Sequence, residues 1–155
     1  MKVLVSACLL GVPCRYDGKS KDVGLQDKYP QLTFVKVCPE VMGGLATPRR
    51  PAEQLLLRTE NHNRGSVVTI DGEDVTREFT DGAKKALEVA LENDCQVAIL
   101  KARSPSCGSG LAYDGTFSGN LIPGDGILAA LLKGNGITIF SEENLDEFEA
   151  FIQEI

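Results

Sequence analysis

The chain has 155 residues, which suits one hydrophobic core of ordinary size and is short for a two-domain enzyme with a separate cofactor module. Hydrophobic residues make up 43% and charged residues 25%, which excludes a disordered chain, and no apolar run is long enough to span a membrane. The formal net charge of -6 argues against a large nucleic-acid partner. We therefore expect a single domain over residues 1–155 with a small-molecule partner.

The chain begins directly with a strand-like run, without the charged and apolar segments of a signal peptide, so we expect a cytoplasmic protein. In that reducing compartment its five cysteines stay as thiols, and such cysteines indicate metal ligands or catalytic thiols more than disulfides. The single histidine, His62, excludes multi-histidine metal sites. Any chemistry therefore depends on sulfur, carboxylates, hydroxyls and amines.

In chain order, the apolar pattern predicts strands at residues 3–5 and 33–37, a surface hairpin over residues 67–75 with an Asp-Gly turn, and a helix over residues 75–92. A strand at residues 97–100, a helix over 125–133, a strand at 137–140 and a helix over 144–154 follow. The strand runs are continuously apolar, which is typical of parallel strands covered on both faces. We expect an open, mostly parallel α/β sheet with helices on both faces, of the Rossmann-like, doubly wound class.

Three cysteines directly follow predicted strands. Cys8 comes after the first strand, Cys38 ends the second, and Cys107 lies in the Gly/Ser-rich loop after the third. Because the carboxyl ends of parallel strands share one edge, where ligands bind, we expect these thiols to converge. Cys14, a few residues beyond Cys8, either joins them or lines the site. Cys95 precedes the third strand, so we expect it at the opposite edge as a small buried hydrophobe.

Polar residues accompany these cysteines. Glu40 follows Cys38 closely, and Ser104 and Ser106 precede Cys107; this carboxylate and these hydroxyls are the candidates for moving protons. The pair Arg49-Arg50 either clamps an anion or is an ordinary basic pair on a surface loop. From spacing alone, a shared site and simple packing of the cysteines both remain open.

Three segments carry a more specific signal: SACLLGVPCRYDG at residues 6–18, CPEVMGGLATPR at 38–49 and KARSPSCG at 101–108. In this order they resemble the thiouracil desulfidase family, over most of the chain. The resemblance implies a 4Fe-4S cluster held by three cysteines, with one iron lacking a protein ligand. It also implies removal of sulfur from a thiolated nucleobase such as 2-thiouracil. For this reaction we expect attack of water at the thioamide carbon and capture of the sulfur at the open iron, without net electron transfer.

Carried over by motif, the ligands are Cys8, Cys38 and Cys107, and the catalytic polar pair is Glu40 and Ser104. The resemblance leaves open whether Cys14 is also a ligand. Lys101 or Arg103 is expected only to balance the negative charge of the cluster.

Two alternatives come from other functional classes. One is a non-catalytic zinc- or sulfur-binding module in which Cys14 completes a closed site of four thiolates. The other is a metal-free transferase with a cysteine nucleophile, which needs a thiol pKa depressed by Arg103 or Lys101. The sequence determines neither the preferred thiolated base nor the oligomeric state.

Overall fold

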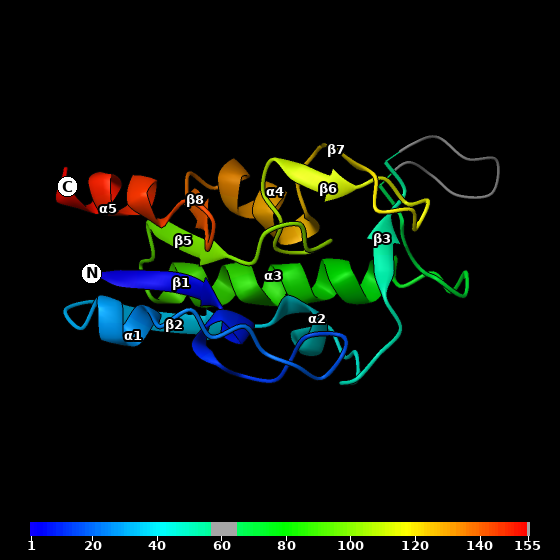
Figure 1. Cartoon of the computed structure of the whole chain (residues 1–155), viewed down its shortest axis with the longest axis horizontal. Helices are drawn as coiled ribbons and strands as arrows, with labels where there is room; N and C mark the ends of the chain where they lie inside the picture. The colour runs from blue at the N-terminus through cyan, green and yellow to red at the C-terminus, as the bar shows by residue number, and fades with distance from the viewer. Residues whose placement is uncertain (57–64, 155) are drawn as a thin grey trace.

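The computed structural model describes residues 1–56 and 65–154, so His62 lies outside the described residues. At its centre is a four-stranded sheet in the order β2-β1-β5-β8, with every pairing parallel (Figure 1). The strands are β1 (Lys2–Ser6), β2 (Thr33–Val37), β5 (Val97–Leu100) and β8 (Thr138–Ser141). The four predicted strands and the parallel sheet are confirmed. From β1 the chain adds β2 on one side of the sheet and then β5 and β8 on the other side. The carboxyl edge between β1 and β5 is therefore a topological switch point.

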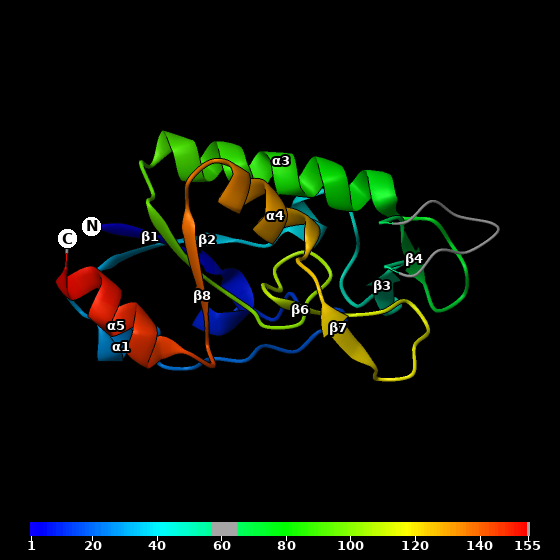
Figure 2. The same ribbon diagram turned by 90° about the horizontal axis from the view of Figure 1, so that it is seen from above.

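Helices cover both faces of the sheet, as expected (Figure 2). On one face lie α3 (Thr76–Glu92) and α4 (Ile127–Gly134), and on the other α1 (Leu25–Lys28) and α5 (Leu145–Gln153). Successive side chains of β1 point in opposite directions, so Leu4 packs toward α3 and α4 while Val3 and Val5 pack toward α1 and α5. No helix in the described ranges is both long and apolar enough to cross a bilayer.

Two small antiparallel ribbons stand beyond the carboxyl ends of the sheet strands (Figures 1 and 2). One pairs β3 (Ala52–Gln54) with β4 (Val67–Thr69), and the other pairs β6 (Leu111–Tyr113) with β7 (Leu121–Pro123). The predicted turn after β4 is present, with a bridge between Val68 and Asp74. The expected surface position is wrong, because Val67 is buried against Val75 and Phe79. The strand β3 and the β6–β7 ribbon were not predicted.

Two short helices follow the first two strands: η1 (Ala7–Leu10) after β1 and α2 (Pro39–Met42) after β2. The helix α2 lies directly on α3, and two glycines make the contact possible. A Cβ on Gly82 would lie 1.8 Å from the carbonyl oxygen of Pro39, and one on Gly43 would lie 1.9 Å from the carbonyl oxygen of Glu78. This close approach fixes the position of the segment that carries Cys38 and Glu40.

Candidate functional site

A cavity of about 560 Å³ lies at the carboxyl edge of the sheet, bordered by the loops that follow β1, β2 and β5. Cys8, Cys14, Cys38 and Cys107 all line it. The convergence expected for three strand-end cysteines is confirmed, and Cys14 joins them. Cys95 lies instead in the apolar core packed against α3 and α4, as expected.

The thiols of the cavity are shielded from water to different degrees. Cys8, Cys14 and Cys107 are buried, and Cys38 is half-buried. Burial, which disfavours the charged thiolate, raises the pKa of Cys8 to about 11 and that of Cys107 to about 12. A hydrogen bond between Cys14 and Cys38 holds the pKa of Cys38 below its usual value and that of Cys14 above it. Four soft sulfur donors that line one cavity are suited to a positively charged, thiophilic group.

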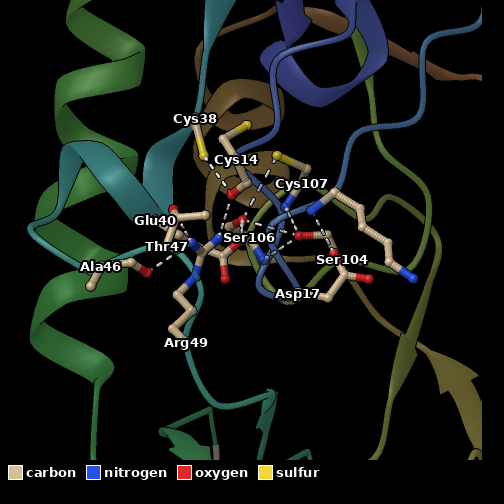
Figure 3. A network of polar contacts seen from close by, with 11 residues as sticks. Cys14, Asp17, Cys38, Glu40, Ala46, Thr47, Arg49, Ser104, Ser106 and Cys107 are labelled. Carbon is tan, nitrogen blue, oxygen red and sulfur yellow. Dashed lines mark hydrogen bonds and ion pairs between the residues drawn. The ribbon is translucent and has the colours of Figure 1, made fainter.

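Glu40 is held in the cavity wall by a buried arginine. Its Oε2 lies 3.4 Å from Nη2 of Arg49, and the two side chains are 18% and 9% exposed. The same Nη2 donates a hydrogen bond to the carbonyl oxygen of Cys14 (2.9 Å), while Nη1 donates to the carbonyl of Ala46 and the hydroxyl of Thr47 (Figure 3). Burial raises the pKa of the Glu40 carboxyl, and the Arg49 guanidinium opposes that rise.

The interpretation as a surface pair therefore holds only for Arg50, which makes an exposed ion pair with Asp71. Arg49 instead clamps an anion, the Glu40 carboxylate. The sequence signal for Arg49 is that it ends the second motif segment, whereas its neighbour Arg50 does not belong to the segment. The basic dipeptide by itself does not distinguish the two.

A chain of hydroxyl groups connects Ser104 to Glu40. The Oγ of Ser104 accepts hydrogen bonds from the backbone N–H groups of Ser106 (3.2 Å) and Cys107 (3.1 Å) and lies 3.1 Å from the Oγ of Ser106. The Oγ of Ser106 in turn donates to Oε2 of Glu40 at 3.5 Å. Ser106 is completely buried. The predicted pair, Glu40 and Ser104, is thus joined through Ser106, which we expected at the same edge but to which the family resemblance gave no role.

Lys101 and Arg103 already face carboxylates. Nζ of Lys101 lies 3.0 Å from Glu142 and Nη1 of Arg103 lies 2.8 Å from Glu143, both from the loop after β8. Lys101 is near enough to Cys8 to lower its pKa, yet the pKa of Cys8 remains raised overall. The geometry therefore does not favour a metal-free nucleophile activated by either of these cations.

Within residues 1–56 and 65–154, no three side chains of Cys, His, Asp or Glu are close enough together to hold a single metal ion. A closed zinc site that uses Cys14 therefore has no support from the geometry. Thiols that line one cavity but do not meet around a single point fit an inorganic core of several metal atoms. In such a core each thiolate binds a different metal atom.

Comparisons of the sequence and of the structure with known proteins point to the same family. The family model described as 2-thiouracil desulfurase matches residues 3–144. The uncharacterized protein YbbK of Bacillus subtilis (strain 168) is 44% identical over 148 residues, covering 94% of this chain and 98% of the relative. The solved structure of a 4Fe-4S-dependent thiouracil desulfidase, TudS (DUF523Vcz), matches with a TM-score of 0.86 at 43% identity and covers 99% of both chains.

Proposed function

This chain belongs to the 2-thiouracil desulfurase family, and from that premise we propose that it converts thiolated nucleobases such as 2-thiouracil to the oxo base and sulfide. The observation that carries the proposal is the gathering of four thiols, a half-buried carboxylate and a serine in one cavity. Its volume of about 560 Å³ is in the range of small-molecule sites, which suits a free base.

We propose that Cys8, Cys38 and Cys107 hold a 4Fe-4S cluster. Their soft donors line one cavity, and the similar protein TudS is 4Fe-4S-dependent by name. When bound through three thiolates, the cluster supplies an iron without a protein ligand, a thiophilic Lewis acid toward the thione sulfur. Cys14 stays outside the ligand set because a fourth thiolate would close that position.

Glu40 is the proposed base for the attacking water. In the described part of the chain, Arg49 and Ser106 both meet its Oε2, so we assign Oε1 to the water. Glu40 orients the water toward the thioamide carbon and takes its proton. Arg49 opposes the rise that burial causes in the pKa of Glu40 and so favours the ionised form that this step requires.

The serine chain is the proposed route for the proton. From Glu40 it passes through the hydroxyl of Ser106 to that of Ser104, which lines the cavity and returns it to the departing sulfur. The reaction balances as thiouracil and water giving uracil and hydrogen sulfide, so no electron donor is consumed. All five cysteines are free thiols, which supports a reducing compartment, and we propose the cytoplasm.

The test is sulfide release under argon. The full chain, reconstituted with iron and sulfide, is incubated with 2-thiouracil and no reductant, and we expect equal amounts of sulfide and uracil. Cys38→Ser is expected to lose both the broad visible absorption of the cluster and the activity. Cys95→Ala, which removes a thiol outside the cavity, is the matched control and should keep both.

Sulfide release at the normal rate from iron-free protein would overturn the cluster proposal. A Cys38→Ser protein with full absorption and full activity would remove Cys38 from the ligand set. Stable binding of one zinc ion with no sulfide release would favour the binding-module alternative.

A further inference from the structure

Part of the cavity wall comes from the two ribbons rather than from the sheet. Ala52 and Glu53 of β3, Tyr113 of β6 and Phe117 of the loop between β6 and β7 all line the cavity. This wall contains no cysteine, and nothing in the proposed chemistry uses it. Two of its side chains, those of Tyr113 and Phe117, are aromatic.

Phe117 has a different environment from the other phenylalanines. The other five all pack in apolar clusters: Phe34, Phe79, Phe140, Phe148 and Phe151. Among the described residues, Phe117 belongs to none of the three clusters. Its ring therefore has a role other than core packing, and the cavity is the space that it borders.

The backbone of Phe117 is in the left-handed region, with a φ of 55°. This conformation is an outlier for a bulky aromatic residue, and such residues persist only where their surroundings enforce them. Oε1 of Glu53 accepts hydrogen bonds from the backbone N–H groups of Gly115 (3.0 Å) and Phe117 (3.2 Å). One carboxylate of β3 therefore fixes the loop that presents the ring.

A second carboxylate organises the same loop from within. Asp114 is buried and accepts hydrogen bonds from the backbone and hydroxyl of Thr116 (2.9 and 2.6 Å) and from the amide of Asn120 (2.7 Å). Two buried or half-buried acids thus hold a strained aromatic residue at the edge of a cavity. Strain of this kind is found at ligand-binding positions.

We propose that Phe117 is a substrate-binding residue, whose ring stacks on the planar face of the thiolated base and so determines selectivity for cyclic, aromatic thioamides. The inference rests on the proposed function, because it places the base between this ring and the cysteines. Every nucleobase has a flat π-face, so stacking orients the ring plane without reading its substituents. The thioamide carbon is then presented to Glu40 in a defined orientation.

The test uses Phe117→Asn, because asparagine adopts left-handed backbone more readily than phenylalanine. We expect a thermal unfolding midpoint equal to or above that of the unsubstituted protein. The KM for 2-thiouracil and the dissociation constant for uracil, measured by equilibrium dialysis, should each rise about tenfold, with a smaller change in kcat. Turnover of thiourea, an acyclic thioamide without an aromatic ring, should be unchanged.

Two further variants separate stacking from volume. Phe117→Tyr should retain base affinity, and Phe117→Leu should lose it although it remains apolar. Leu111→Ala is the matched control, because this exposed side chain of β6 is not part of the cavity lining. Unchanged uracil affinity in Phe117→Leu or Phe117→Asn would overturn the inference, as would a lowered unfolding midpoint with normal binding.

Failure of the proposed function can be distinguished from failure of the stacking site. A protein that binds uracil through Phe117 but releases no sulfide from 2-thiouracil would contradict the desulfidase reaction and still support the stacking site. A protein that releases sulfide normally in all Phe117 variants would support the reaction and contradict the stacking site.

Discussion

The two sides of the cavity are built in different ways. On the sheet side, the loops with Cys8, Cys38 and Cys107 follow strands of the parallel sheet, and β1 and β5 are almost completely buried. On the ribbon side, three-residue strands support a loop that is held by side-chain hydrogen bonds to its backbone. Within that loop a Cβ on Gly115 would lie 2.8 Å from the carbonyl oxygen of Gln54, whereas one on Gly119 would meet no atom within 4 Å.

This difference matches the two tasks that we propose. Metal ligands and proton-transfer groups need fixed distances, and dense packing against buried strands provides them. The wall that contacts the ligand is a loop whose conformation depends on a few polar contacts. Other single side chains of this loop can therefore be replaced without disturbing the sheet. Substitutions on the sheet side should therefore affect chemistry and folding, and those on the ribbon side mainly ligand affinity.

The largest effect is expected for Glu40→Gln on the sheet side. Loss of the proposed base should lower kcat for 2-thiouracil by about 10²- to 10⁴-fold, while cluster absorption is retained. Initial rates of sulfide release measure the effect. Glu143→Gln, at a half-exposed carboxylate paired with Arg103, is the control and should keep its activity. A Glu40→Gln enzyme with normal kcat would exclude Glu40 as the base.

Gly82→Ala tests the packing of α2 on α3. The new methyl group would collide with the Pro39 carbonyl, so we expect a loss of about 1–3 kcal/mol in the free energy of unfolding. In Gly134→Ala, at the end of α4, the methyl group meets nothing within 4 Å, and a gain of up to about 1 kcal/mol is expected from helix propensity. Chemical denaturation measures both. If both substitutions raised the free energy of unfolding, the close contact between α2 and α3 would be contradicted.

The serine chain predicts non-additive effects. Ser106→Ala should lower kcat about tenfold, because it interrupts the link between Ser104 and Glu40 and leaves a buried acceptor without its donor. Ser104→Ala interrupts the same route, so the double variant should be no slower than the slower single variant. If the reductions in kcat of the two single variants multiplied in the double variant, the two hydroxyls would act separately.

The smallest effect is expected on the ribbon side, for Asp114→Ala. Amide hydrogen exchange over residues 114–120 should become faster and uracil binding weaker, with cluster absorption unchanged. Hydrogen bonds from Thr116 and Asn120 hold the pKa of Asp114 below its usual value. Its stabilisation of the loop is therefore present above the ordinary aspartate pKa and lost as the pH falls through the lowered one. Equal exchange rates in both proteins would contradict this role.

Sequence reasoning was most successful where one segment carries a complete pattern. The buried strands β1 and β5 appear as unbroken apolar runs, and the 17 residues of α3 show helical spacing. The strand β3 and the β6–β7 ribbon escaped prediction because three-residue strands are too short to display a period, and Ala52–Gln54 also contains no β-branched residue. The buried position of Val67 depends on Phe79 of α3, which the local pattern does not reveal.

The amino-acid sequence by itself determined the parallel α/β architecture, the placement of three cysteines at strand ends and the family, because these depend on local hydrophobicity and on contiguous motifs. Only the tertiary structure decided which polar groups meet. Arg49 reaches Glu40 and Cys14, Ser106 joins Ser104 to Glu40, and Glu53 holds Phe117 at the cavity. Apart from the Arg49–Glu40 and Ser104–Ser106 contacts, these partners are 35 or more positions apart in sequence. Their contacts arise from packing between elements, which no single segment encodes.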